Sequence, residues 1–85
     1  MIVEAVKYTI WAADSARAAK FYTTAFAGEI TRQNPHITDV TIHGATISIH
    51  ANGSGEKTWT GTTFQVPDVV AAAAEVVAAG GTLSR

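Results

Sequence analysis

Asp39, Ser48 and His50 are the residues of this sequence whose types and spacing could do chemistry together. A carboxylate, a hydroxyl and an imidazole can transfer protons, and the carboxylate and imidazole can begin a substitute metal site. The same residues also suit the solvated face of an antiparallel sheet, and no nucleophile elbow surrounds Ser48 to support a hydrolase. The sequence therefore leaves proton transfer, metal binding and a plain polar surface open.

Lys7 and Trp11 form a second candidate group. Residues 3–11 alternate as a half-buried strand does, which puts both side chains on one face. Lysine would supply a point charge and the indole a stacking surface, so the pair could bind an anion or an aromatic ligand. Alternatively, the lysine extends into solvent beside a tryptophan at a subunit contact.

A hairpin must position the Asp39 group. A tight turn at residues 43–44 pairs Val40 with Ile47, which gathers the aliphatic side chains on one face. The opposite, polar face is then predicted to carry the cross-strand pairs Ile37/His50, Asp39/Ser48 and Thr41/Thr46.

A repeat organises the chain around this hairpin. Asp14 and Asp68 each cap an Ala-rich helix, and Gly28 and residues 80–81 end the two helices. The predicted order is β-α-β-β-β followed by β-α-β, in which the last full strand covers residues 59–66. We expect one domain, 1–85, made of a first module (1–51), a glycine-rich connector (52–58) and a second module (59–85) that is cut short.

Composition excludes several classes of protein. The 85 residues carry a net charge of −1 and no basic run, which argues against nucleic acid or an anionic membrane as a partner. The absence of cysteine excludes disulfides and thiolate chemistry. No secretory leader and no 18-residue apolar run occur, so a cytoplasmic protein is expected.

The two units together resemble the vicinal oxygen chelate superfamily, which includes glyoxalase I, bleomycin-resistance proteins and extradiol dioxygenases. The resemblance implies an α+β fold: a βαβββ module followed by an incomplete βαβ module, in a mixed sheet with helices on one face. It is carried by Asp14, Ala18, Phe21, Tyr22, Phe26 and Glu29 in the first unit, and by Val66, Asp68, Val69, Ala72, Ala79, Gly80 and Gly81 in the second.

The resemblance also places the metal ligands of metal-dependent members at Lys7, Ser48 and Gly61, with a fourth on a final strand that this sequence lacks. A catalytic divalent metal needs about three imidazole or carboxylate ligands, which these residues do not supply. No metal ligand and no cofactor are therefore expected, and a divalent metal is the less favoured alternative.

Residues and resemblance together predict a protein that binds a small organic ligand as a homodimer, whose sheet edges pair between subunits. No catalytic residue is assigned, His50 and Asp39 being candidates only. One alternative is a lyase, isomerase or dioxygenase with an atypical metal site around these two residues, and another is a ligand-free assembly module or protein fragment. The expected ligand-binding residues are Lys7, Thr9, Trp11, Thr46, Ser48, His50, Thr63 and Gln65.

Overall fold

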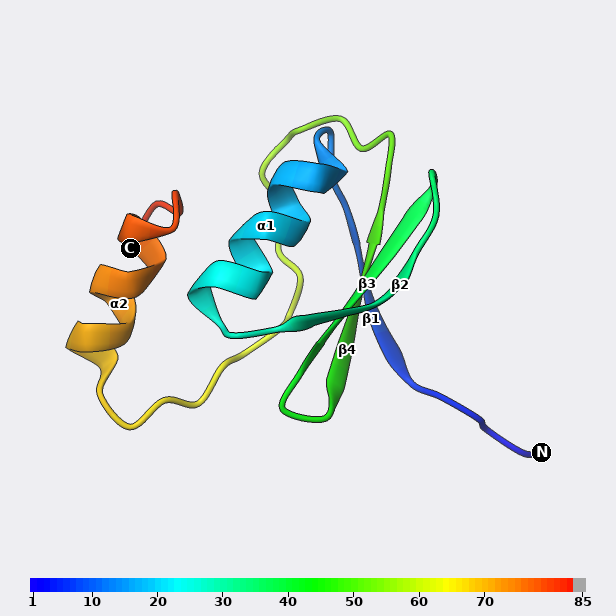
Figure 1. Cartoon of the computed structure of the whole chain (residues 1–85), viewed down its shortest axis with the longest axis horizontal. Coiled ribbons are helices and arrows are strands. Elements are labelled where there is room, and N and C mark those ends of the chain that lie inside the picture. The colour runs from blue at the N-terminus through cyan, green and yellow to red at the C-terminus, as the bar shows by residue number, and fades with distance from the viewer. Residues whose placement is uncertain (84–85) are drawn as a thin grey trace.

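A four-stranded mixed sheet and two helices make up the computed structural model, which describes residues 1–83 (Figure 1). The strand order is β1-β4-β3-β2, with β1 parallel to β4 and the other neighbours antiparallel. This is the predicted α+β class, and the first unit has the predicted βαβββ order. The elements are β1 Lys7–Trp11, α1 Ser15–Ala25, β2 Glu29–Gln33, β3 Ile37–Ile42, β4 Ala45–His50 and α2 Val69–Ala78.

The β3-β4 hairpin has the predicted register. Val40 lies opposite Ile47 and Asp39 opposite Ser48, because the two-residue turn at 43–44 fixes the pairing. Both turn residues have positive φ, 46° at His43 and 83° at Gly44, as hairpin turns that match the twist of the strands require. The alternation of side chains then separates an aliphatic face from a polar one.

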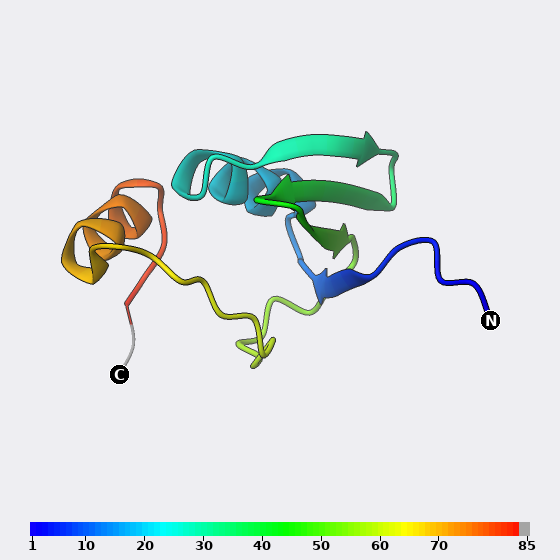
Figure 2. The ribbon, with the colours of Figure 1, turned by 90° about the horizontal axis from the view of Figure 1, so that it is seen from below.

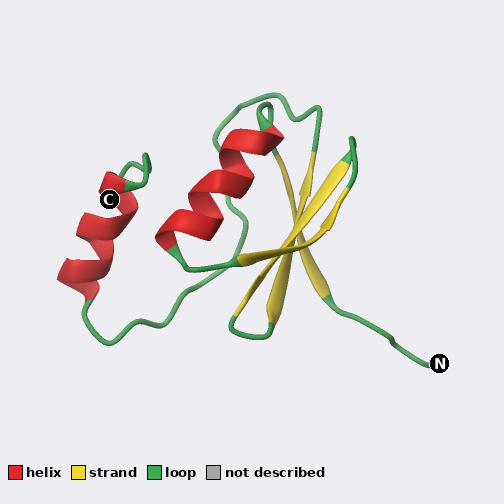
Figure 3. Cartoon of the chain, in the orientation of Figure 1, coloured by secondary structure: helices red, strands yellow, loops and turns green. Residues whose placement is uncertain are grey.

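The core lies between α1 and the aliphatic face of the sheet, which α1 covers in Figure 3. Val40 and Ile49 are fully buried at the centre of this face, and Ala19 of α1 packs against them. Burial of one large aliphatic side chain stabilises a fold by about 1.5–3 kcal/mol, so this small cluster holds the first unit together.

The two helices begin alike and end differently. The carboxylates of Asp14 and Asp68 each accept a backbone N–H at 3.0 Å, from Arg17 and Ala71 respectively. At the end of α2, the N–H groups of residues 80 and 81 donate to the carbonyls of residues 77 and 76, which is the predicted glycine stop in the form of a Schellman motif.

The prediction that Gly28 ends α1 is wrong, because Gly28 does not supply the left-handed residue that follows the helix. The left-handed residue after α1 is Ala27, with φ of 53°. Gly28 is required by packing instead, since a Cβ there would lie 2.5 Å from Val40 Cγ1.

The predicted strand over residues 59–66 does not form. The strand predicted after the second helix does not form at residues 82–83 either, and residues 84–85 lie outside the described part of the chain. A strand needs a neighbour for its backbone hydrogen bonds, and among residues 1–83 none lies beside this segment. Gly61, with φ of 73°, also interrupts the extended backbone. The segment is held by Phe64, whose ring stacks on Phe26 at 4.1 Å between centroids.

The second helix lies beside α1 and away from the sheet (Figure 2). None of its residues, all of which the structure describes, is buried. The radius of gyration is 13.2 Å, against about 12 Å for a compact domain of this length. No helix within residues 1–83 is long and apolar enough to cross a membrane.

Candidate functional site

The polar face, defined as the side of the sheet opposite α1, carries three rows of side chains across β3, β4 and β1. Neighbouring rows lie about 7 Å apart, because two residues separate them along each strand. The structure thus brings together Asp39 and all the predicted ligand-binding residues of β1 and β4. The rows are Thr41–Thr46–Lys7, Asp39–Ser48–Thr9 and Ile37–His50–Trp11.

An ion pair crosses the middle of this face. Lys7 Nζ donates a hydrogen bond of 2.7 Å to Asp39 Oδ2, and the lysine stem spans β4 to reach it. The two side chains differ in exposure, 36% for Lys7 and 3% for Asp39. The carboxylate is therefore fixed within the sheet, whereas the ammonium remains partly in water.

A second cation, Arg32 of β2, comes next to Asp39 through an irregularity in the sheet. The β2-β3 register shifts between Ile30 and Arg32, so Arg32 lies opposite Asp39. An unbroken antiparallel register continuing from the Ile30–Val40 pair would put Arg32 opposite Thr38 on the other face. The sequence predicted neither Lys7 nor Arg32 as a partner of this carboxylate, and no local pattern marks the register shift.

Asp39 is a carboxylate at neutral pH. Burial alone would raise its pKa, but the hydrogen bond from Lys7, the Ser48 hydroxyl and the charges of Lys7 and Arg32 together hold the pKa below its ordinary 3.8. Ser48 lies directly opposite Asp39 in the hairpin. The second carboxylate oxygen, Oδ1, is buried and has no other hydrogen-bond partner among residues 1–83.

An aromatic pair borders the Asp39 row. The rings of Trp11 and His50 lie 4.8 Å apart between centroids and are tilted by 57°. Trp11 is 66% exposed and His50 half-buried, so the indole presents a ring to solvent. A planar ligand could stack there and reach the Asp39 row with a polar group.

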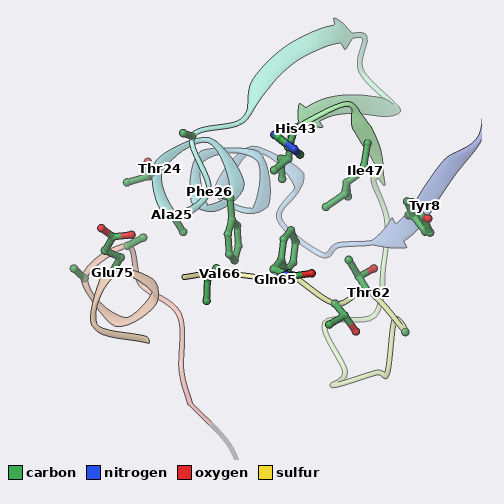
Figure 4. A pocket seen from close by; sticks show the side chains of 18 residues that line it. Tyr8, Thr24, Ala25, Phe26, His43, Ile47, Thr62, Gln65, Val66 and Glu75 are labelled. Carbon is green, nitrogen blue, oxygen red and sulfur yellow. The ribbon is translucent and has the colours of Figure 1, made fainter. Parts of the chain in front are cut away.

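A separate helix-side pocket of about 1100 Å³ opens on the other face of the sheet (Figure 4). The end of α1, residues 61–66 and α2 surround it, and its lining is mostly apolar. Thr63 and Gln65, predicted to bind ligand with the β1 and β4 residues, line this pocket and do not reach the polar face. Its apolar side chains include Tyr8, Phe26, Ile42, Ile47, Phe64 and Val66.

The family's metal positions do not converge. Lys7 and Ser48 belong to the polar face, whereas Gly61 lines the helix-side pocket. Within residues 1–83, no group of three or more His, Cys, Asp or Glu side chains could hold a metal ion. The residues present at these positions do not fit a divalent metal, so no chemistry is assigned to one.

Comparison with known proteins agrees with this architecture. The family model of the Glyoxalase/Bleomycin resistance protein/Dioxygenase superfamily matches residues 5–85. The chain belongs to this superfamily. The matched residues include the whole βαβββ unit, whose sheet has the polar face on one side and the helix-side pocket on the other.

A solved structure shares the superfamily fold. It is the X-ray structure of a gene product from Arabidopsis thaliana, with a TM-score of 0.69 and 19% sequence identity over 93% of this chain and 75% of that chain. At this identity the likeness concerns the fold alone. No curated protein matches the chain.

Proposed function

We propose that this superfamily member binds a small organic ligand on its polar face, without a metal, and acts as a cytoplasmic homodimer. The observation that carries the proposal is the exposed Trp11 ring, paired with His50, one row from the buried Asp39 carboxylate. An aromatic surface beside a few fixed polar groups is the usual composition of a small-molecule site.

Side chains with hydrogen-bonding capacity surround the aromatic pair. Thr9 and Ser48 share the Asp39 row, and Thr46 occupies the next row. A ligand stacked on Trp11 would meet hydroxyls along β1 and β4 at row spacings of about 7 Å. This spacing suits a single-ring ligand with one polar substituent.

The excess surface of the chain supports a second copy as its partner. The accessible surface is 6695 Å², roughly 1900 Å² more than a compact monomer of this mass has. A standard interface buries about 800 Å² on each partner. The exposed residues of α2, including Val69 and Val70, and the edge of β1 would supply such an interface.

Tryptophan fluorescence tests ligand binding at this site. The Trp59→Phe variant retains Trp11 as its single indole, and Trp59 is fully exposed, so the fold is unaffected. Among amphipathic antibiotics, 2-oxo aldehyde adducts and catechols, a ligand of the polar face will change Trp11 emission and raise the melting temperature. The proposal fails if every compound that stabilises the protein does so equally in Trp11→Ala.

Sedimentation equilibrium tests the homodimer. We expect a dimer at micromolar concentration and above. Val70→Lys, which places a charge on the exposed face of α2, will shift the equilibrium towards monomer, whereas Lys57→Glu in the connector will not. A stable monomer across this concentration range would contradict the dimer while leaving the ligand site untouched.

A further inference from the structure

The Asn52-Gly53 pair, which follows β4, carries a chemistry that the ligand site does not use. Asparagine readily loses its side-chain amide when the next residue is glycine, because no side chain shields the backbone nitrogen of that residue. Asn52 is exposed to solvent. The other asparagine, Asn34, precedes Pro35, whose nitrogen has no proton to lose, so the sequence holds one asparagine that can react in this way.

The reaction closes a five-membered ring from the chain itself. The backbone nitrogen of Gly53 gives up its proton and attacks Cγ of Asn52, and the side-chain nitrogen leaves as ammonia. Water then opens the resulting succinimide at either of its two carbonyls. Opening at the Cγ carbonyl gives aspartate. Opening at the backbone carbonyl gives isoaspartate, in which the main chain runs through Cβ and Cγ and is one methylene longer.

In the folded protein the attacking nitrogen is held away from this reaction. The N–H of Gly53 donates a hydrogen bond of 3.0 Å to the carbonyl of Ala12, just beyond the end of β1. The backbone of Gly53 also lies tightly against that strand end, since a Cβ at this position would lie 2.7 Å from Ala12 N and 2.8 Å from the carbonyl carbon of Trp11. The nitrogen must leave this contact before it can approach the Asn52 side chain.

This contact is also where the second unit leaves the first. Residues 54–67 make no backbone-to-backbone hydrogen bond with any residue of the described chain, 1–83. Asn52 has a left-handed φ of 67°, which asparagine and aspartate both tolerate. An aspartate at this position therefore keeps the contact, whereas the longer main chain of an isoaspartate displaces Gly53 from Ala12.

We propose that Asn52 is a site of spontaneous deamidation whose rate is set by the detachment of residues 51–53 from the end of β1. The isoaspartate product does not re-form the contact between Gly53 and Ala12, so the modification frees the connector from the first unit. Neither a ligand nor a second copy takes part in the reaction.

Mass spectrometry of peptides measures the reaction. The full-length protein is incubated at mildly alkaline pH, folded or in guanidinium chloride, and the conversion of Asn52 is followed by the mass difference between an amide and a carboxyl group. We expect the folded chain to convert at least about tenfold more slowly than the unfolded chain, with Asn34 unchanged in both. Equal rates in the two states, or no conversion of Asn52 in guanidinium chloride, would overturn the proposal.

Matched proline variants test whether detachment controls the rate. Ala51→Pro removes the N–H that donates to the His36 carbonyl at 2.9 Å, and it loosens residues 51–53 without changing the reacting pair. Thr58→Pro is the control, because its N–H makes no backbone hydrogen bond within residues 1–83. Each folded rate is divided by the rate of the same variant in guanidinium chloride, which cancels the effect of neighbouring residues.

We expect the rate ratio to rise about threefold or more in Ala51→Pro and to stay unchanged in Thr58→Pro. If Ala51→Pro does not fold, Ala51→Gly serves instead, with a rise of about twofold through added backbone freedom. A folded Ala51 variant with the wild-type ratio would show that detachment of residues 51–53 does not control the reaction.

Amide hydrogen exchange at Gly53 tests the consequence of the modification. Asn52→Asp represents the aspartate product, and the isoaspartate form is separated from aged protein by chromatography. We expect the Gly53 amide to be protected in the wild type and in Asn52→Asp, and to exchange at least about tenfold faster in the isoaspartate form. Equal protection in all three forms would contradict the release of the connector.

Discussion

The two repeated units share their local structure but differ in what surrounds it. Both α1 and α2 begin with an aspartate cap whose carboxylate accepts a backbone N–H at 3.0 Å. Helix α1 lies on a sheet and contributes to a core in which Val40 and Ile49 are fully buried. Helix α2 has no buried residue, and its Val69, Val70 and Val77 are exposed to solvent.

This difference shows that capping and burial are specified separately. A cap depends on residues within one turn of the helix end, so each repeat carries it. Burial depends on a sheet, and within the described chain only the first unit has one. Apart from Glu75, α2 consists of alanine and valine, and a helix so rich in apolar residues normally buries part of its surface, which is why we propose that a second copy covers it.

The largest effect is expected from paired truncations in the two units. Ile49→Ala will lower the free energy of unfolding by about 2–5 kcal/mol at every protein concentration, because it leaves a cavity beside α1. Val70→Ala, at a site that is 82% exposed, will change it by less than about 0.5 kcal/mol in dilute monomer. Urea unfolding monitored by circular dichroism measures both.

A cost of Val70→Ala equal to that of Ile49→Ala in dilute solution would show that α2 is already buried within the monomer. An effect of Val70→Ala that grows with protein concentration would instead show that a second copy buries α2.

A smaller effect is expected at Gly28, where the chain passes close to the sheet. An alanine Cβ there would lie 2.5 Å from Val40 Cγ1 and 3.0 Å from Ile42 Cγ1. Gly28→Ala will therefore destabilise the protein by about 1–3 kcal/mol through overpacking. Thermal unfolding measures the loss, and Val40→Ala in the same chain should recover part of it. An unchanged melting temperature would show that the backbone at Gly28 does not approach β3 so closely.

The Asp39 carboxylate predicts a pH dependence confined to the first unit. Its pKa is lowered in the folded state, so its stabilising contribution is present above the unfolded value near 3.8 and is lost as the pH falls through the folded value. Wild type will therefore lose stability at acid pH more steeply than Asp39→Asn. Urea midpoints between pH 3 and 6 measure the two slopes, and equal slopes would contradict the assignment.

The smallest effects come from the two helix ends. Ala27→Gly relieves a left-handed residue with φ of 53° and will stabilise the protein by up to about 1 kcal/mol. Gly80→Ala introduces such a residue at φ of 100° and will destabilise it by a similar amount. Melting temperatures check both, and changes of the same sign would show that the two helices end alike.

The sequence predicted what short-range rules determine. The hairpin register follows from the turn at 43–44 and from strict alternation, and it placed Asp39, Ser48 and His50 on one face as found. The N-caps at Asp14 and Asp68 needed only the residue type and the following helix. These features depend on few neighbours.

Features that depend on distant partners could not be read from the sequence. Residues 59–66 have the composition of a strand, but a strand forms only beside another strand, so Thr63 and Gln65 lie by the helix-side pocket. The position of Arg32 opposite Asp39, where its charge lowers the pKa of the carboxyl, depends on a register shift that no residue pattern marks. The Lys7–Asp39 pair joins strands that are not neighbours in the sheet.

Hydrogen exchange measured at several protein concentrations tests the central comparison most directly. We predict that amides of β3 and β4 exchange slowly at every concentration, because the first unit forms its own core. Amides of α2 will exchange rapidly in dilute monomer and become protected as the dimer forms. Protection of α2 equal to that of β4 in a verified monomer would contradict the account.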